Sequence, residues 1–199
     1  MLTSCDASSV VTDRLGDQAG GQEVTVACFY FDFAAQKEHS PSRMLGAVLR
    51  QVVSGLGKVP EEIAQAYKNQ KQVIDGRGPQ LGDIVTMLQN TVSIKRTFIC
   101  VDALDECVAE YRVRILGSLS QILQSSPGTR IFVTGRPQIR AEVEDRLTGK
   151  VMTIGIIPRR HDIISYLHNK LSEDPMPGAM DHSLKTDILR KIPEDVSEM

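Results

Sequence analysis

Apolar residues follow two different periods along the chain, and these periods predict alternating strands and helices. Short β-branched or aromatic runs, typical of buried strands, lie at residues 24–33, 97–101, 130–134 and 151–157. Apolar residues at helical spacing predict helices over residues 1–15, 41–56, 60–74, 81–92, 111–124, 138–147, 162–171 and 184–192. This alternation predicts an α/β fold with a mostly parallel sheet and flanking helices.

The predicted helix at residues 41–56 carries signals at both ends. Ser40 and Pro41 are the residue types preferred at the N-cap and at the first helical position. Gly57 follows the last apolar position and can stop the helix. The pattern therefore predicts both the existence and the limits of this helix.

The chain divides at a stretch rich in Pro and Gly, residues 173–179, which predicts a linker. The 199 residues are enough for one domain with a sizeable core. We expect that domain to occupy residues 1–172. Residues 173–199 would then hold the linker and the start of a further helical region.

The strand predicted at residues 97–101 ends in a group of carboxylates. Asp102 follows it directly, and Asp105 and Glu106 come next. Acids at the carboxyl end of such a strand lie where open α/β sheets bind ligands, and Mg²⁺ prefers hard oxygen ligands. The pattern is that of a Walker B segment, in which the first Asp holds Mg²⁺. The alternative is a strand followed by an acidic helix start, since Asp and Glu favour helix N-termini.

A second strand end carries a basic residue. The TGRP segment, Thr134–Pro137, closes the strand predicted at residues 130–134, and in a parallel sheet it emerges at the same edge as Asp102. Arg136 could contact a phosphate oxygen there and stabilise negative charge. The alternative is a surface arginine in front of a Pro-started helix. The acidic strand end nearby favours the phosphate interpretation.

Composition and charge narrow the classes of function. The net charge of −2 gives no electrostatic case for binding nucleic acid or an anionic membrane, so neither partner is expected. No apolar run has the length of a transmembrane helix, and the first residues lack the basic region of a secretory signal. The four cysteines form no CxxC pair, and the four histidines show no metal-ligand spacing. A reducing, cytoplasmic location fits this pattern.

Taken together, these motifs resemble a known family. The strand that ends in Asp102-Ala103-Leu104-Asp105-Glu106 resembles the Walker B segment of NACHT domains, which are signal-transduction (STAND-class) P-loop NTPases. Residues 131–137 (IFVTGRP) look like the sensor strand of that family and its Arg-Pro turn. Supporting segments are similar to fungal nephrocystin-type N-terminal domains: the aromatic strand at residues 27–33, the helix that follows Ser40 and the helix at residues 162–167. The resemblance covers nearly the whole chain.

The resemblance implies a P-loop NTPase-like fold, a bound ATP or GTP with Mg²⁺, and roles for four residues. Asp102 would hold Mg²⁺, usually through water. Asp105 and Glu106 would be catalytic, ordering the surrounding waters and activating the hydrolytic one; the alternative is that they only cap a helix. Arg136 would sense the terminal phosphate.

One part of the family pattern is missing from the 199 residues. A P-loop needs GxxxxGK[ST], because its backbone N–H groups cradle the phosphates and its Lys and Ser/Thr serve the phosphates and Mg²⁺. The pairs Gly57-Lys58 and Gly149-Lys150 both lack the first Gly and the following Ser or Thr. In the family, the P-loop and a preceding strand come just before a helix that resembles residues 1–15. We therefore expect residues 1–172 to be a partial NACHT-type nucleotide-binding domain, a fragment without its first strand and P-loop.

Two functions from different classes follow. The first is a NACHT-type NTPase module with an incomplete nucleotide site, in which binding and hydrolysis of ATP or GTP by this chain alone are weak or absent. The second is a non-enzymatic interaction or regulatory domain that forms a homo-oligomer or pairs with full-length relatives. A third idea is an unrelated α/β enzyme with a metal site at Asp102, Asp105 and Glu106. No nucleophile–base motif such as GxSxG supports that third idea.

Overall fold

A computed structural model describes residues 13–15, 24–72, 78–147, 149, 151–156, 159–174 and 180–197. They belong to two compact units, one within residues 2–151 and one within residues 152–199. The elements of the first unit are β1 (Val24–Tyr30), η1 (Phe33–Ala35), α2 (Pro41–Ser54), α3 (Glu61–Gln72), α4 (Leu81–Val92), β2 (Arg96–Asp102), η2 (Leu104–Glu106), α5 (Ala109–Ser125), β3 (Arg130–Val133), η3 (Pro137–Ile139) and α6 (Arg140–Arg146). Those of the second are α7 (Arg160–Ser172) and α8 (His182–Ser197).

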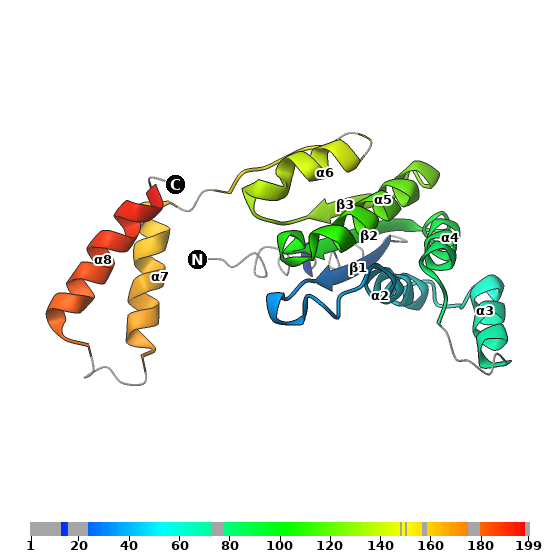
Figure 1. Cartoon of the computed structure of the whole chain (residues 1–199), viewed down its shortest axis with the longest axis horizontal. Helices are drawn as coiled ribbons and strands as arrows, with labels where there is room; N and C mark the ends of the chain where they lie inside the picture. The colour runs from blue at the N-terminus through cyan, green and yellow to red at the C-terminus, as the bar shows by residue number, and fades with distance from the viewer. Residues whose placement is uncertain are drawn as a thin grey trace. The chain divides into compact units, whose positions relative to one another are not determined.

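The strands form one parallel sheet in the order β1-β2-β3 (Figure 1). Its register places Cys28 opposite Cys100, and Cys100 opposite Phe132. Parallel neighbours need crossover connections, and helices supply them between β1 and β2 and between β2 and β3. The prediction of an α/β fold with a mostly parallel sheet and flanking helices is confirmed.

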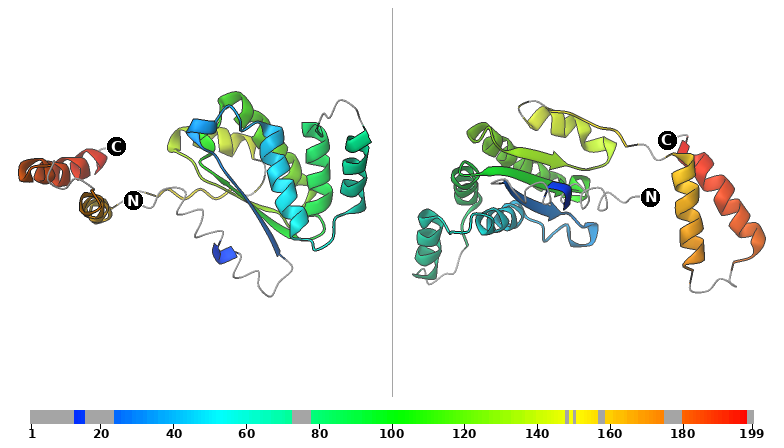
Figure 2. Two further views of the ribbon diagram at one scale, coloured as in Figure 1. Left: turned by 90° about the horizontal axis from the view of Figure 1, so that it is seen from below. Right: turned by 180° about the vertical axis from the view of Figure 1, so that it is seen from behind.

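One face of the sheet carries the hydrophobic core. Alternate strand residues point to the same face, and Ala27, Ile99 and Val101 are completely buried there. Helices α2 and α4 pack against each other over the sheet, as Figure 2 shows. Fully burying an aliphatic side chain contributes about 1.5–3 kcal/mol, so the apolar stripe of α2 supplies much of the packing energy. That stripe consists of Met44, Leu45, Val48, Leu49 and Val52.

Helix α2 begins as its sequence predicts but ends earlier. The Ser40 hydroxyl accepts a hydrogen bond from the Arg43 N–H at 3.3 Å, and Pro41 is the first helical residue. The last residue is Ser54, so the predicted limit at residue 56 and the assignment of Gly57 as the stop are wrong. Gly55 lies against β1, and a Cβ atom there would stand only 2.8 Å from Cγ2 of Thr25. The close approach of the helix end to the strand thus requires glycine two residues before the one expected.

The outer edge of β1 is closed by a side chain of α2. The Cys28 N–H donates to Oε1 of Gln51 at 2.9 Å, and Nε2 of Gln51 donates to the Cys28 carbonyl at 2.8 Å. A carboxamide carries one donor group and one acceptor, so it can pair with a strand residue as a neighbouring backbone would. Gln51 thus satisfies an edge residue that would otherwise be left to solvent.

The strand predicted at residues 151–157 is wrong as far as the structure describes it. Residues 151–156 form no strand, and residue 157 lies outside the described residues. Met152, Ile154 and Ile156 are 82%, 75% and 80% exposed. A β-branched sequence becomes a strand only when a neighbour pairs with its backbone and packs on its side chains. Residues 151–156 have the composition of a strand, but none of the described strands pairs with them.

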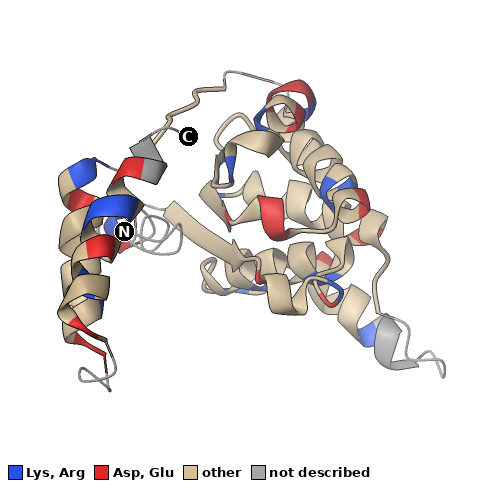
Figure 3. Ribbon diagram, turned by 60° about the vertical axis from the view of Figure 1, so that its left-hand side comes forward, with Lys and Arg blue, Asp and Glu red and all other residues tan. Residues whose placement is uncertain are grey.

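The second unit is a pair of helices, α7 and α8, that pack against each other. Both confirm predicted helices, and α7 buries Ile163. Acidic and basic residues are interleaved along them in Figure 3, with exposed ion pairs such as Lys170–Glu173 and Arg190–Asp187. The domain boundary at residue 172 stays a prediction. Of the helix predicted at residues 1–15, residues 13–15 are helical and the others lie outside the described residues.

Candidate functional site

The carboxyl ends of β2 and β3 meet at one edge of the sheet. The Thr134 N–H donates to the Val101 carbonyl at 2.9 Å, and the Leu104 N–H donates to the Thr134 carbonyl at 3.0 Å. The Thr134 hydroxyl donates to Oδ1 of Asp102. Asp102 is buried, with only 3% of its surface exposed. A charge-assisted hydrogen bond of this kind compensates part of the cost of burying a carboxylate. The predicted metal ligand Asp102 is therefore fixed by the strand that carries the predicted phosphate sensor.

The residue after Asp102 has a left-handed backbone. Ala103 has φ 52° and ψ 45°, the one positive φ among the non-glycine residues that the structure describes. Its N–H donates to the Thr134 hydroxyl oxygen at 3.0 Å. The left-handed region costs an L-residue roughly 1–2 kcal/mol, and such strain gathers at functional sites. Here the turn sends the chain from β2 directly into η2.

Asp105 holds the turn that follows β3. Its carboxylate accepts the Arg136 N–H at 3.2 Å and lies 3.3 Å from Nε of the same arginine. The Asp105 side chain is 7% exposed, whereas that of Arg136 is 71% exposed. Gly135 lies beside them, and a Cβ atom there would stand 2.6 Å from Cδ1 of Ile139 and 3.4 Å from Oδ1 of Asp105, so a larger residue would have to displace the Ile139 side chain. Asp105 therefore orients an arginine whose guanidinium remains largely open to solvent.

Glu106 reaches a third element. Its Oε2 accepts the Phe33 N–H at 2.9 Å, at the start of η1. Asp32 caps the same turn by accepting the Ala34 N–H at 2.9 Å. Glu106 thus ties the segment after β1 to the end of β2. The alternative that Asp105 and Glu106 cap the start of the following helix is wrong, because neither η2 nor α5 has a side-chain cap. Both carboxylates instead accept backbone N–H groups of segments distant in the sequence.

Of the four predicted site residues, Asp105 and Arg136 contact each other directly. Asp102 is bonded to Thr134, two residues before Arg136, and Glu106 is bonded to Phe33. The structure also adds the hydroxyl of Thr134, whose part as the partner of Asp102 was not anticipated. The sequence could have indicated this pair, because Thr134 follows the strand that lies next to the strand ending in Asp102. Within the described residues, no three His, Cys, Asp or Glu side chains are grouped so that they could hold a metal ion. A metal at Asp102 would thus depend on water and on a ligand for its other oxygens.

Cys107 closes η2 and is not a reactive thiol. Burial raises the pKa of the Cys107 thiol to about 11. The positive charge of Arg112 lowers this pKa somewhat, and the negative charge of Glu142 raises it slightly. The thiol donates weakly to the Val108 carbonyl at 3.6 Å. Since the thiolate is the nucleophilic form, Cys107 stays protonated and inert near neutral pH. The acidic edge therefore contains no cysteine nucleophile at this position.

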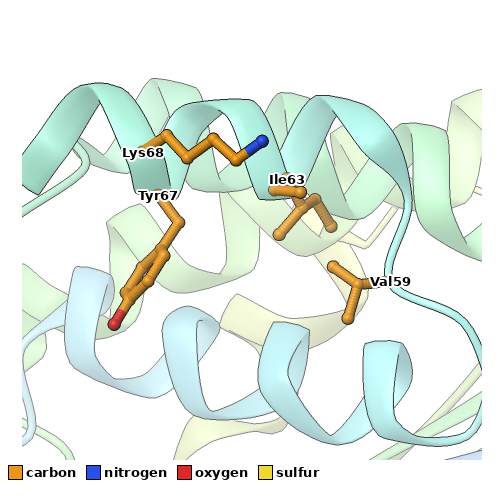
Figure 4. Close-up of a pocket in the computed structure, with 5 residues that line it drawn as sticks. Val59, Ile63, Tyr67 and Lys68 are labelled. Atoms are coloured by element: carbon orange, nitrogen blue, oxygen red, sulfur yellow. The ribbon is translucent and has the colours of Figure 1, made fainter.

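A separate hollow of about 540 Å³ lies beside α3. Its lining is Val59, Ile63, Ala64, Tyr67 and Lys68, most of which Figure 4 labels. The side chains are mainly apolar, and none of the predicted site residues is among them. Ligand sites usually combine an apolar wall with convergent polar groups, so this hollow does not compete with the acidic edge as a candidate nucleotide site. No helix among the described residues is long and apolar enough to cross a membrane.

Comparison with known proteins identifies the family. No curated protein matches the chain. Among solved structures, it is similar to the Aeropyrum pernix Orc1 protein in complex with DNA, at 17% identity and a TM-score of 0.49. That match covers 98% of this chain and 51% of the other, so the chain spans about half the length of that protein. The sequence model of the family described as nephrocystin 3, N-terminal, matches residues 5–136, which is more than half of the chain. The chain therefore belongs to the nephrocystin 3 N-terminal family.

Proposed function

We propose that this chain is part of a NACHT-type signal-transduction NTPase module and contributes the metal side of a nucleotide site. The observation that carries the proposal is the direct link between the two strand ends, in which the Thr134 hydroxyl holds Asp102. This link places a carboxylate and an arginine-bearing turn at the edge where α/β sheets bind ligands. Family membership supports the same interpretation.

Each residue at this edge would have a separate role. Asp102 would bind Mg²⁺, usually through water, and Thr134 would keep its carboxylate oriented. Arg136 would contact the terminal phosphate, because its exposed guanidinium can leave Asp105 for a ligand. Asp105 and Glu106 would order nearby waters and activate the hydrolytic one. Their present contacts with Arg136 and Phe33 support at least a positioning role.

The phosphate side does not fit a nucleotide in these 199 residues. No GxxxxGK[ST] segment is present, and the exposed Arg136 alone cannot replace a cradle of backbone N–H groups. We therefore expect ATP and GTP to bind very weakly or not at all, and no hydrolytic step is assigned to this chain alone. The chemistry that Mg²⁺ would supply here is the neutralisation of phosphate charge.

The test has two arms on the full chain. In the first, a fluorescent ATP or GTP analogue is titrated with Mg²⁺, and the expected Kd is weaker than about 1 mM. Micromolar binding that Asp102→Ala abolishes would contradict the expected weakness. In the second, Mn²⁺ replaces Mg²⁺ and is followed by electron paramagnetic resonance. Weak binding should be lost in Asp102→Asn and kept in the control Asp83→Asn, which alters an exposed helix-cap carboxylate.

The second function, a non-enzymatic interaction domain, is favoured by a different observation. Among the described residues, no strand pairs with the outer side of β1 or of β3, and at β1 Gln51 bonds Cys28. Unpaired edges are templates for pairing with another chain. The two functions are compatible, because self-association through such an edge does not require nucleotide.

A further inference from the structure

Two cysteines lie side by side on neighbouring strands of the sheet. The register of β1 and β2 places Cys28 directly opposite Cys100. Side chains alternate between the two faces of a sheet, and the adjacent residues Ala27 and Ile99 belong to the hydrophobic core. Cys28 and Cys100 therefore both point to the other face, where they are direct neighbours. Both are thiols in the structure.

The spacing of the two strands suits a bond between these thiols. Neighbouring strands stand about 4.8 Å apart, and disulfides join residues whose Cα atoms are about 4.4–6.8 Å apart. The Cβ atoms of a disulfide must approach each other to about 3.8 Å, which is closer than the strand spacing. A disulfide between Cys28 and Cys100 would therefore be strained, and strained disulfides are the ones that are easily reduced. The pair has the geometry of a reversible link and not that of a permanent one.

We propose that Cys28 and Cys100 form a dithiol site that exchanges with a small-molecule disulfide and closes reversibly to link β1 to β2. Cys28 is half-buried and Cys100 is 2% exposed, so Cys28 is the thiol that meets the oxidant. Its thiolate attacks one sulfur of the small disulfide, forms a mixed disulfide and releases one small thiol. The Cys100 thiolate then attacks the Cys28 sulfur and releases the second small thiol. Two protein thiols are oxidised, the small disulfide is reduced to two thiols, and these take up the two protons.

The dithiol site lies next to the acidic edge. Cys28 and Cys100 each come two residues before Tyr30 and Asp102, which are also opposite each other in the register. Residues two apart in a strand share a face, so the dithiol lies on the same face of the sheet as Asp102. Closing the disulfide therefore ties β1 to the strand end that carries Asp102. The proposal does not depend on metal or nucleotide binding at that edge.

Cys107 provides an internal control for the chemistry. It lies outside the strands, so no cysteine is placed opposite it by the register of the sheet. It is also buried, and that burial raises the pKa of its thiol to about 11. Cys107 should therefore remain a thiol under conditions that oxidise the other two residues.

The test oxidises the full, unaltered chain with glutathione disulfide, alkylates the remaining thiols under denaturing conditions and maps the products by mass spectrometry. A protease that cleaves before aspartate places the four cysteines on four different peptides. The Cys28 and Cys100 peptides should be joined, with the loss of two hydrogen atoms, and Cys107 should be alkylated. Because Cys100 is held beside Cys28, the internal disulfide should exceed the mixed disulfide with glutathione by at least about tenfold. Dithiothreitol should restore both thiols.

Two variants separate the parts of the exchange. Cys100→Ala removes the second thiol and should leave Cys28 as the mixed disulfide with glutathione. Cys107→Ala truncates another buried cysteine and should keep the internal link. The result on the unaltered chain decides the proposal even if a variant fails to fold.

Three results would overturn the proposal. They are the absence of a link between Cys28 and Cys100 in the oxidised chain, a link from either residue to another cysteine or another molecule in its place, and a link that survives dithiothreitol. Any of these leaves the nucleotide proposal untouched, since the Asp102 titrations decide that.

Discussion

The two outer strands of the sheet satisfy their hydrogen bonds in different places. At β1, Gln51 closes the middle of the strand by bonding both groups of Cys28. Directly after β3, Thr134 bonds to Val101 and Asp102 of β2 through its N–H and hydroxyl, and its carbonyl accepts the Leu104 N–H of η2. The β1 edge is thus built to end the sheet. The residue that follows β3 fixes the turn that carries Arg136, and no strand among the described residues pairs with the outer side of β3.

This difference also explains how the site is stabilised. A side chain that caps an edge affects one strand, whereas Thr134 couples two strands, the left-handed turn at Ala103 and the buried Asp102. Loss of the Thr134 hydroxyl should therefore lower the free energy of unfolding more than loss of the Gln51 carboxamide. Substitutions at the two edges can measure that difference directly.

The largest expected effect is that of Thr134→Val. This change leaves the Ala103 N–H and the buried Asp102 carboxylate without the hydroxyl, so the free energy of unfolding should fall by about 3 kcal/mol. Urea denaturation followed by circular dichroism measures the change. Thr134→Ser keeps the hydroxyl and should retain most of the stability. Equal loss in both variants would show that the hydroxyl does not couple the strands.

At the other edge, Gln51→Leu removes the cap of β1. It removes the two hydrogen bonds that Gln51 makes to the N–H and carbonyl of the half-buried Cys28, and the expected loss of unfolding free energy is about 2 kcal/mol. The matched control is Gln89→Leu, which removes one exposed hydrogen bond to the Gln121 carbonyl and should cost much less. If the two glutamines cost the same in urea denaturation, Gln51 is not an edge cap.

The smallest expected effect is that of Asp105→Asn, at the turn that follows β3. Asp105→Asn keeps an oxygen for the Arg136 N–H but removes the charge that faces the guanidinium. Because Arg136 is largely exposed, solvent screens the ion pair, and the loss should be about 1 kcal/mol or less by thermal unfolding. The control Glu38→Gln alters a pair that is exposed on both sides and should change stability even less. A larger loss from Glu38→Gln would remove any special role for Asp105.

Much of the fold was predictable because helix and strand periods are local properties of the chain. The predicted strands at residues 24–33, 97–101 and 130–134 and the helix at residues 81–92 appear within a few residues of their expected limits. The gathering of Asp102 and Arg136 at one edge also follows from the sequence, because parallel strands place their carboxyl ends together. Periodicity alone could not decide whether residues 151–157 form a strand, because a strand also needs a neighbouring strand to pair with.

The sequence by itself determined which elements form and which acidic and basic residues end neighbouring strands. The tertiary structure alone decided the partner of each side chain: Thr134 for Asp102, Arg136 for Asp105, Phe33 for Glu106 and Cys28 for Gln51. The physical reason is one of range. Periodicity and caps act over a few residues, whereas these hydrogen bonds join groups 23 to 73 positions apart, which only packing brings within reach.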